Sequence, residues 1–326
     1  MRILVTGGSG FIGTNYIDLL LRTGQAEFIN LDNQPPRNAD HRNFWRECDI
    51  LNLCRLKNII VDFSPTHVVH LAARTGLDEK SLSDFAANME GVDNLLRALA
   101  EAPVERTIFT SSLLVCRMGY VPKHDMDYQP TTLYGQSKVE GEKIVRAHKD
   151  LPYAWTIIRP ISIWGPWGEE PYKNFFKFIA QGWYFHIGSG HYRRSLGYVG
   201  NTVHQIQKLL SAPREKVDRK TIYVADDLPA DLHDMAHMIQ KTVGARDIFR
   251  IPLWMARWAA KVGDGCKVVG WDNVPLTSFR LNNILTEYVF NMQPIMELSS
   301  PLPYTLQEGV EQTLQWLCDR GEIKRT

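Results

Sequence analysis

The sequence has few cysteines, and none of them is arranged as in a disulfide framework or a zinc site. Its five cysteines are scattered, their number is odd, and no Cys-x-x-Cys pair occurs. No run of 18 apolar residues is present, which excludes a helical membrane span. The strand-like residues directly after Met1 leave no room for a signal peptide. We therefore expect a cytoplasmic protein in a reducing compartment, without a metal site.

The sequence also lacks an excess of charge of either sign and lacks internal repeats. It has 37 Lys and Arg residues against 36 Asp and Glu residues, a net charge of +1. Nucleic-acid binding depends on clustered cations, so we expect no nucleic acid as a partner, and no membrane because no spanning segment occurs. The 326 residues suffice for a large core and about two structural units.

Short apolar segments alternate with segments of helical periodicity through the first half of the chain. Strands are expected at 3–6, 28–31, 67–71, 106–110 and 154–159, and helices at 12–22, 51–63, 82–102 and 132–148. Apolar strands that alternate with helices indicate a parallel sheet covered on both faces. The sequence therefore predicts an α/β fold, a Rossmann-type doubly wound parallel sheet.

The pattern changes after Pro160. Residues 164–185 are dense in aromatic side chains, which we interpret as packing, and a strand at 221–225 returns to the sheet. Helical patterns follow at 231–243 and 307–317. We expect a Rossmann domain over 1–163, with 197–226 returning to it, and a smaller, mostly helical C-terminal substrate lobe formed by 164–196 and 227–326.

A glycine-rich segment lies between the first expected strand and the first expected helix. In Thr6-Gly-Gly-Ser-Gly-Phe-Ile-Gly13, the glycines at 7, 10 and 13 follow a Gly-x-x-Gly-x-x-Gly spacing. Gly7, Gly10 and Gly13 allow a tight turn, a close approach of backbone to a pyrophosphate, and close packing of helix on strand. Because the helix N-terminus then faces the phosphates, the segment predicts dinucleotide binding.

Asp32 ends the second expected strand, 19 positions after Gly13. A carboxylate there can accept hydrogen bonds from ribose hydroxyls and repel a 2′-phosphate, which favours NAD over NADP. Arg37 lies near enough in sequence to complicate this choice. The alternative for Asp32 is a turn residue before Asn33.

Tyr134 and Lys138 are four residues apart in an expected helix, so both project from one face. An ammonium group near a phenol stabilises the phenolate and lowers its pKa from about 10. Such a tyrosine can exchange a proton with a substrate hydroxyl while a hydride passes to or from a nicotinamide. Ser112 follows an expected strand and places a hydroxyl in the crevice where ligands of such sheets bind.

These motifs together resemble one family. The glycine segment at 6–13, His-Leu-Ala-Ala at 70–73, Thr-Ser-Ser at 110–112, Tyr-x-x-x-Lys and Arg159-Pro160 are similar to the extended short-chain dehydrogenase/reductases, in the NAD-dependent epimerase/dehydratase group that acts on nucleotide sugars. The resemblance covers residues 1–205. It implies NAD as the cofactor and a homodimer formed through the helices at 82–102 and 132–148.

The resemblance also implies roles for residues. Tyr134 would be the acid/base, Lys138 would bind the nicotinamide ribose and tune Tyr134, and Ser112 would hydrogen-bond the reacting oxygen. Further cofactor contacts would come from Phe11, Ile12, Asn33, Asp49, Ile50, Leu71, Ala72, Ala73 and Asn88. Arg194 would meet the substrate's pyrophosphate, for which a bidentate guanidinium is suited, and Asn174 would lie near its nucleotide.

Some positions depart from the family pattern. Leu113-Leu114 stands where many sugar dehydratases carry Asp-Glu, and leucine cannot eliminate water by acid/base chemistry. Arg74, Asn201 and the packed Cys116 also differ from relatives. We therefore expect hydride transfer at a sugar carbinol, C4, by a 4-epimerase or a 4-ketoreductase. The alternatives are a reductase or dehydrogenase of an apolar alcohol such as a steroid, and a non-catalytic NAD-binding sensor.

Overall fold

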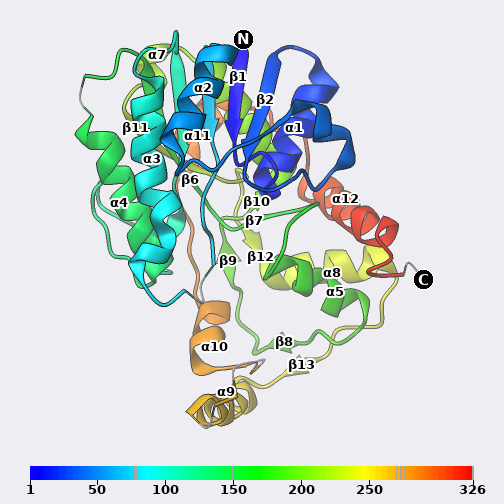
Figure 1. Cartoon of the computed structure of the whole chain (residues 1–326). Coiled ribbons are helices and arrows are strands. Elements are labelled where there is room, and N and C mark those ends of the chain that lie inside the picture. Colours follow the sequence, from blue (N-terminus) through cyan, green and yellow to red (C-terminus); the bar gives the residue numbers. More distant parts are fainter. Residues whose placement is uncertain (77–78, 149, 269, 272–273, 275, 325–326) are drawn as a thin grey trace.

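A parallel sheet forms the centre of the molecule. The structure is a computed structural model that describes residues 1–326 except 77–78, 149, 269, 272–273, 275 and 325–326. Over this described part, one sheet has the strand order β11-β6-β5-β4-β1-β2-β3 (Figure 1). Its strands are β1 (Arg2–Thr6), β2 (Glu27–Asp32), β3 (Trp45–Glu47), β4 (His67–His70), β5 (Arg106–Thr110), β6 (Ala154–Pro160) and β11 (Lys220–Val224). All neighbouring pairs are parallel, which confirms the predicted Rossmann-type sheet.

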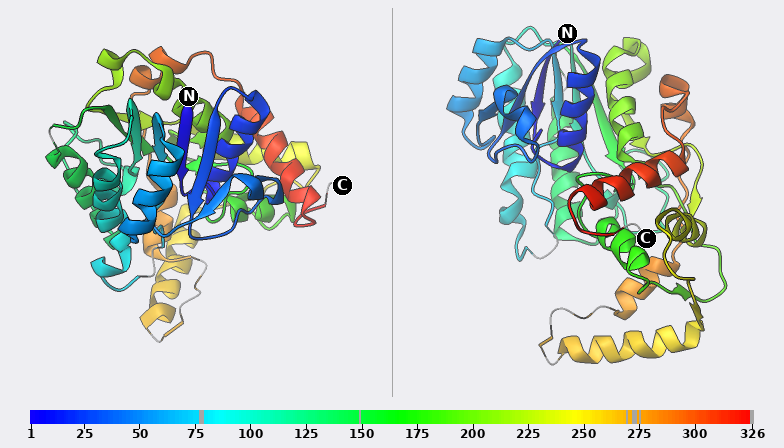
Figure 2. Two further views of the ribbon diagram at one scale, coloured as in Figure 1. Left: turned by 45° about the horizontal axis from the view of Figure 1, so that its top comes forward. Right: turned by 90° about the vertical axis from the view of Figure 1, so that its right-hand side faces the viewer.

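The sheet is buried on both faces. In β1, Leu4 packs into one apolar core, and its neighbours Ile3 and Val5 pack into the other, because successive side chains of a strand point to opposite faces. One face carries α2 (Leu53–Phe63), α3 (Ala86–Leu99) and α4 (Leu133–Ala147), and the other carries α1 (Phe11–Thr23), α6 (Val199–Ser211) and α11 (Gln293–Ser299) (Figure 2). This two-sided burial explains why the strands are apolar throughout.

The helices expected in the first half are confirmed, with small shifts at their ends. Gly24 ends α1 in the left-handed conformation at φ 60°, as a C-terminal glycine does. The helix expected at 82–102 starts with a 3₁₀ turn, η2 (Leu82–Phe85), because Ser81 and Asp84 form a capping box there, and α3 ends at Leu99. Two short 3₁₀ segments, η1 (Ala39–Phe44) and η3 (Leu113–Val115), were not expected.

The strand expected at 221–225 is β11, which pairs with β6 and extends the central sheet. We did not predict α6, which precedes it, nor the three-residue β3. Asn201 of α6 is buried, where its amide donates to Asp226 at 2.9 Å and to the Tyr304 carbonyl at 2.9 Å. In this chain Asn201 therefore joins α6 to the end of β11 and to the C-terminal segment.

The C-terminal lobe is mostly helical, with short two-stranded pairs. Its helices are α5 (Tyr172–Ala180), α8 (Leu232–Val243), α9 (Leu253–Val268), α10 (Ser278–Leu285) and α12 (Leu306–Asp319); a short α7 (Arg214–Val217) precedes β11. The pairs are β7 (Ile163–Trp164) with β10 (Gly197–Tyr198), β8 (His186–Ile187) with β13 (Arg250–Ile251), and β9 (Arg193–Arg194) with β12 (Ala230–Asp231). The structure confirms the helices expected at 231–243 and 307–317 as α8 and α12.

The aromatic-rich stretch contributes to the core, as expected. Trp164 is fully buried, and its ring centroid lies 5.7 Å from that of Phe176 and 5.1 Å from that of Tyr198. By contrast, α9 and α10 form a unit at the end of the molecule opposite the N-terminus (Figure 2). Among the described residues, no helix has the length and apolar character that a membrane crossing requires.

Candidate functional site

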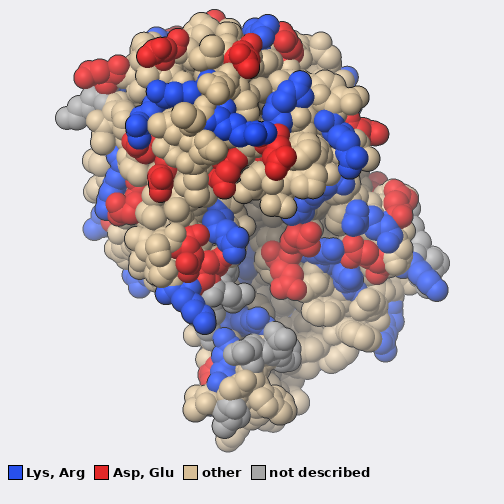
Figure 3. Space-filling view, in the orientation of Figure 1, with Lys and Arg blue, Asp and Glu red and all other residues tan. Residues whose placement is uncertain are grey.

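A cavity of about 910 Å³ lies at the carboxyl edge of the sheet. Figure 3 shows the surface hollowed in this region, below the sheet. Its lining includes most of the residues that the sequence analysis selected: Gly7, Gly10, Phe11, Ile12, Gly13, Asp32, Asn33, Asp49, Ile50, Leu71, Ala72, Ala73, Ser112, Tyr134 and Lys138. One cavity thus joins the glycine segment to the tyrosine–lysine pair, about 120 residues apart in the chain.

The glycine segment brings backbone close to backbone at the start of α1. Gly7 has φ +74°, and a Cβ on it would lie 2.4 Å from the Ala72 nitrogen. A Cβ on Gly13 would lie 2.2 Å from the Gly7 carbonyl oxygen. Gly10 precedes α1 and offers no side-chain cap, so the first amide groups of the helix remain available to an anion. The segment fits a pyrophosphate group.

Asp32 is held at the cavity by backbone amides. Its carboxylate accepts hydrogen bonds from the amides of Ser9 at 3.0 Å and Gln34 at 2.9 Å. Burial raises the pKa of Asp32, and these two hydrogen bonds counter the rise. Arg37, the residue that complicated the choice of cofactor, also lines the cavity and donates to the Trp167 carbonyl at 3.0 Å and to Glu169 at 3.3 Å.

The three proposed catalytic side chains meet at the other end of the cavity. Thr132 caps α4 by accepting a hydrogen bond from the Gly135 amide at 3.0 Å, so Tyr134 and Lys138 lie in the first turns of the helix. Lys138 Nζ donates to the Thr110 carbonyl at 2.9 Å, at the end of β5. Ser112, two residues further on, caps η3 and lines the cavity together with Tyr134. The start of α4 and the segment that follows β5 therefore position all three side chains.

Burial dominates the electrostatics of this group. It raises the pKa of Tyr134 to about 12, against the opposing influence of the Ser112 hydroxyl. It lowers the pKa of Lys138 to about 8, and the carboxylate of Glu142 partly offsets this. We expected the ammonium to lower the pKa of the phenol. Lys138 Nζ lies 6.0 Å from the centre of the Tyr134 ring, and burial of the phenol outweighs its influence.

Glu142 is a buried carboxylate next to the candidate site that the sequence analysis missed. It lies one helical turn beyond Lys138 on the same face of α4 and is almost fully buried. Its two oxygens accept hydrogen bonds of 2.6 to 2.9 Å from Ser111, Tyr128 and Arg159. These donors hold the pKa of Glu142 below its usual value. Glu142 is therefore an ionised carboxylate close to the Lys138 ammonium. The Tyr-x-x-x-Lys-x-x-x-Glu spacing was the available signal.

Asn88, expected to contact the cofactor, does not line the cavity. It is buried beneath the cavity wall, where its side-chain oxygen accepts from the Arg74 amide at 2.8 Å. Its amide nitrogen donates to the Arg74 carbonyl at 2.9 Å and to Ser137 at 2.8 Å. Asn88 therefore fixes the segment after β4 against α4, and it supports lining residues from behind.

The two expected substrate residues also lie outside the cavity lining. Asn174 is on α5 and donates to Glu170, which does line the cavity, at 2.6 Å. Arg194 is buried in β9, and its guanidinium donates to the carbonyls of Asn283 and Ile284 at the end of α10. In this arrangement Arg194 fastens α10 to the rest of the lobe.

Replacement of Arg194 by Ala is therefore expected to lower the free energy of unfolding by about 2 kcal/mol, because two carbonyls lose a charged donor. Urea unfolding of the wild type, Arg194→Ala and Arg194→Lys measures this change. A variant that keeps its stability but loses affinity for UDP would instead support the expected contact with a substrate pyrophosphate.

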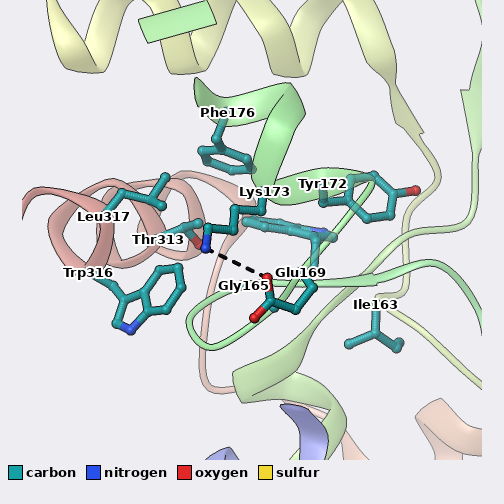
Figure 4. A pocket seen from close by; sticks show the side chains of 11 residues that line it. Ile163, Gly165, Glu169, Tyr172, Lys173, Phe176, Thr313, Trp316 and Leu317 are labelled. Carbon is teal, nitrogen blue, oxygen red and sulfur yellow. Dashed lines mark ion pairs between the residues drawn. The ribbon is translucent and has the colours of Figure 1, made fainter. Parts of the chain in front are cut away.

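A second, much smaller cavity of about 10 Å³ lies between α5 and α12 (Figure 4). Lys173 reaches across it to Glu169 at 3.6 Å and forms a second ion pair with Glu322 at 3.0 Å. Glu169 also lines the large cavity and pairs with Arg37. These ion pairs connect the rim of the large cavity to the segment that follows α12.

The buried cysteine beside the site has no sign of reactivity. Cys116 donates to the Asp127 carbonyl at 3.2 Å, and burial raises the pKa of its thiol. A raised pKa disfavours the thiolate, which is the nucleophilic form. Cys116 is therefore a packed residue, as the sequence analysis expected.

Known proteins resemble the chain over nearly its full length. It is 26% identical over 327 residues to the N-acetyl-alpha-D-glucosaminyl-diphospho-ditrans,octacis-undecaprenol 4-epimerase of Escherichia coli O157:H7, covering 97% of this chain and 95% of that protein. It is 27% identical over 337 residues to the UDP-glucose 4-epimerase of Vibrio cholerae, covering 96% and 94%. The solved UDP-glucuronic acid 4-epimerase of Bacillus cereus, in complex with UDP-glucuronic acid and NAD, has the same fold, with a TM-score of 0.74 at 19% identity over 98% of this chain and 100% of that one.

The family model for the NAD dependent epimerase/dehydratase family matches residues 3–225. This range contains the glycine segment, Asp32 and the Ser112–Tyr134–Lys138 group. The cofactor is NAD, whose pyrophosphate and ribose groups the glycine segment and Asp32 fit. The chain belongs to the NAD dependent epimerase/dehydratase family.

Proposed function

We propose that the protein is a 4-epimerase of a sugar carried on a diphosphate, with a nucleotide sugar as the first candidate substrate. One observation carries the proposal: Ser112, Tyr134 and Lys138 line the same cavity as the glycine segment and Asp32. A hydride acceptor bound along this cavity by its pyrophosphate would extend toward Tyr134. The epimerases among its relatives support the choice of reaction.

The side chains divide the work at the reacting carbon. NAD supplies the hydride acceptor and donor. The phenolate of Tyr134 takes the hydroxyl proton of the sugar as the hydride leaves, and the resulting phenol returns the proton when the hydride comes back to the opposite face of the keto sugar. Ser112 hydrogen-bonds the same oxygen and fixes its position, and the Lys138 ammonium stabilises the phenolate form of Tyr134 that accepts the proton. With a pKa of about 8, Lys138 is mostly protonated at pH 7 and can do so.

The neighbouring side chains argue against a dehydratase. Leu113 and Leu114 follow Ser112 in η3, and neither can act as an acid or a base.

An epimerase and a ketoreductase differ in whether the cofactor is recycled within one turnover. Purified protein incubated with UDP-glucose and UDP-N-acetylglucosamine should yield the 4-epimers without net change in nicotinamide absorbance. Stoichiometric consumption of a reduced nicotinamide would instead identify a ketoreductase.

A sugar on a polyprenyl diphosphate is the second candidate substrate. The Escherichia coli relative, which is named for such a substrate, aligns with 97% of this chain. Both candidates present a sugar ester of a diphosphate, so the chemistry at C4 is the same. Parallel assays with UDP-N-acetylglucosamine and with N-acetylglucosaminyl-diphospho-undecaprenol in detergent would distinguish them.

Asp32 should determine the preference for NAD. We expect Asp32→Asn to raise the affinity for NADP about tenfold or more, since a carboxylate near the 2′-phosphate is removed. Titration of NAD and NADP followed by protein fluorescence measures both affinities. Asp49→Asn is the control, because Asp49 also lines the cavity but is expected near the adenine. Unchanged NADP affinity in Asp32→Asn would contradict the proposed role.

A further inference from the structure

Helix α9 exposes an apolar face. Trp254, Trp258 and Val262 follow one another at intervals of four residues, so they form one stripe along the helix. Their exposed fractions are 64%, 68% and 63%. The opposite face carries Ala256 and Ala260, which are fully buried against α10.

The exposed stripe is unusual for a helix surrounded by water. A surface helix ordinarily turns one apolar face inward and a polar face outward, whereas α9 has an apolar face on each side. Met255 and Val268 of the same helix and Trp271 beyond it are exposed as well. Large apolar patches at a surface mark sites of interaction with proteins or membranes.

Tryptophan and basic residues together favour a membrane over a protein. Indole rings concentrate at the level of lipid headgroups, where one end of the ring is apolar and the other meets water. Exposed cations accompany the stripe: Arg250, Arg257, Lys261 and Lys267. The acidic residue within α9, Asp264, accepts a hydrogen bond from the Ser278 amide at 3.0 Å. This segment is therefore basic in a chain of net charge +1, which suits anionic headgroups.

The position of α9 makes its outer face accessible along its length. The helix lies across the end of the molecule opposite the N-terminus (Figures 1 and 2). The strands of the sheet run toward the same end, so the carboxyl edge with the large cavity faces the α9–α10 unit (Figure 1). A flat surface could contact α9 without covering the sheet.

We propose that α9 docks on the surface of an anionic lipid bilayer, with Trp254, Trp258 and Val262 among the headgroups and the helix parallel to the membrane. The helix has 16 residues, which is too short to cross a bilayer but sufficient to lie within its interface. The expectation that no membrane is a partner rested on the lack of a spanning segment, which a surface helix does not need. This inference goes beyond the proposed reaction and does not depend on it.

Co-sedimentation with vesicles tests the proposal. The full chain is mixed with vesicles of phosphatidylcholine and phosphatidylglycerol, or of phosphatidylcholine alone. We expect the wild type to sediment with the anionic vesicles and to release from them as salt rises, because salt screens the attraction. The Trp254→Ser/Trp258→Ser variant should bind about tenfold more weakly, since it loses apolar contact area in the interface.

Val61→Ser is the matched control. Val61 is similarly exposed, at 70%, but lies on α2, at the other end of the molecule (Figure 1). The Val61→Ser variant should bind vesicles as the wild type does. NAD titration checks that each variant is folded. A wild type that stays in solution, or a double variant that binds like the wild type, would overturn the proposal.

The same samples distinguish a second copy of the chain as the occupant. Analytical ultracentrifugation without vesicles gives the oligomeric state of the wild type and the double variant. A wild-type dimer that becomes monomeric in the variant, with no vesicle binding by either, would assign the stripe to a dimer interface and overturn membrane docking. None of these measurements requires turnover, so their outcome does not depend on whether the proposed reaction is correct.

Discussion

Replacement of Tyr134 by Phe is expected to lower turnover by about 10²- to 10⁴-fold, the usual effect of losing a positioned acid/base. Hydride cannot leave the carbinol carbon productively unless the attached oxygen loses its proton as well. Tyr134 lines the large cavity together with Ser112 and lies one helical turn before Lys138, so its hydroxyl is the group placed to take that proton.

The substitution should leave the fold intact. Phe keeps the ring, whose centroid lies 6.2 Å from that of Phe85, and removes only the hydroxyl. Single-turnover hydride transfer, followed by nicotinamide absorbance with a UDP-sugar, measures the effect, and a far-UV spectrum with NAD titration checks the fold. Tyr16→Phe is the control, because Tyr16 is fully buried in α1 and donates to Gln207 far from this group. A Tyr134→Phe rate within about threefold of the wild type would place the acid/base elsewhere.

The sheet and its helices could be predicted because their signals are local. Each buried strand is a short apolar run with a glycine, proline or polar turn nearby, and the strand at 106–110 has the same bounds in the structure. Two elements of this part of the fold were missed, β3 and α6. β3 has three residues, Trp45–Glu47, too few to show a period.

The lobe was less predictable because its helices depend on distant contacts. α9 carries apolar residues on two faces, and the sequence alone cannot tell which face is buried. Arg194 resembles a substrate contact in its local motif, but its guanidinium partners, Asn283 and Ile284, are about 90 residues away in the chain. No pattern around residue 194 contains that information.

The residues of the candidate site also fall into two groups, those recognisable from local sequence and those that only the structure could place. The glycine segment, Asp32 and the pair Tyr134–Lys138 are recognisable because each role needs residues that are adjacent in sequence or one helical turn apart. Asn88 was placed in the cofactor site because the motif carries no information on the direction of its amide, which turns toward Arg74. Burial also outweighs the nearby ammonium in setting the pKa of Tyr134, and only the folded structure shows how deeply the phenol is buried.

Lys138→Met should make the protein more stable and nearly inactive. Lys138 has a pKa of about 8 in the folded state against 10.5 as its ordinary value, because burial penalises the ammonium. This difference corresponds to a destabilisation of about 3 kcal/mol at pH 7. Met fills a similar volume without charge, and the loss of the hydrogen bond to the Thr110 carbonyl costs about 1 kcal/mol. We expect a net rise of about 1–2 kcal/mol in the free energy of unfolding.

The dependence on pH identifies the cause. A lysine whose folded pKa is lowered destabilises the folded state fully below pH 8, and this destabilisation disappears as pH rises from about 8 to 10.5. The stability advantage of Lys138→Met should therefore be largest at pH 7 and shrink toward pH 10. Urea unfolding without NAD at several pH values measures it. Lys143→Met, on the exposed side of α4 in an ion pair with Glu140, should stay within about 0.5 kcal/mol of the wild type. A Lys138→Met variant less stable than the wild type at pH 7 would contradict this prediction. It would mean that the hydrogen bond to Thr110 and the nearby Glu142 outweigh the burial of the charge, so that the Lys138 ammonium does not destabilise the fold.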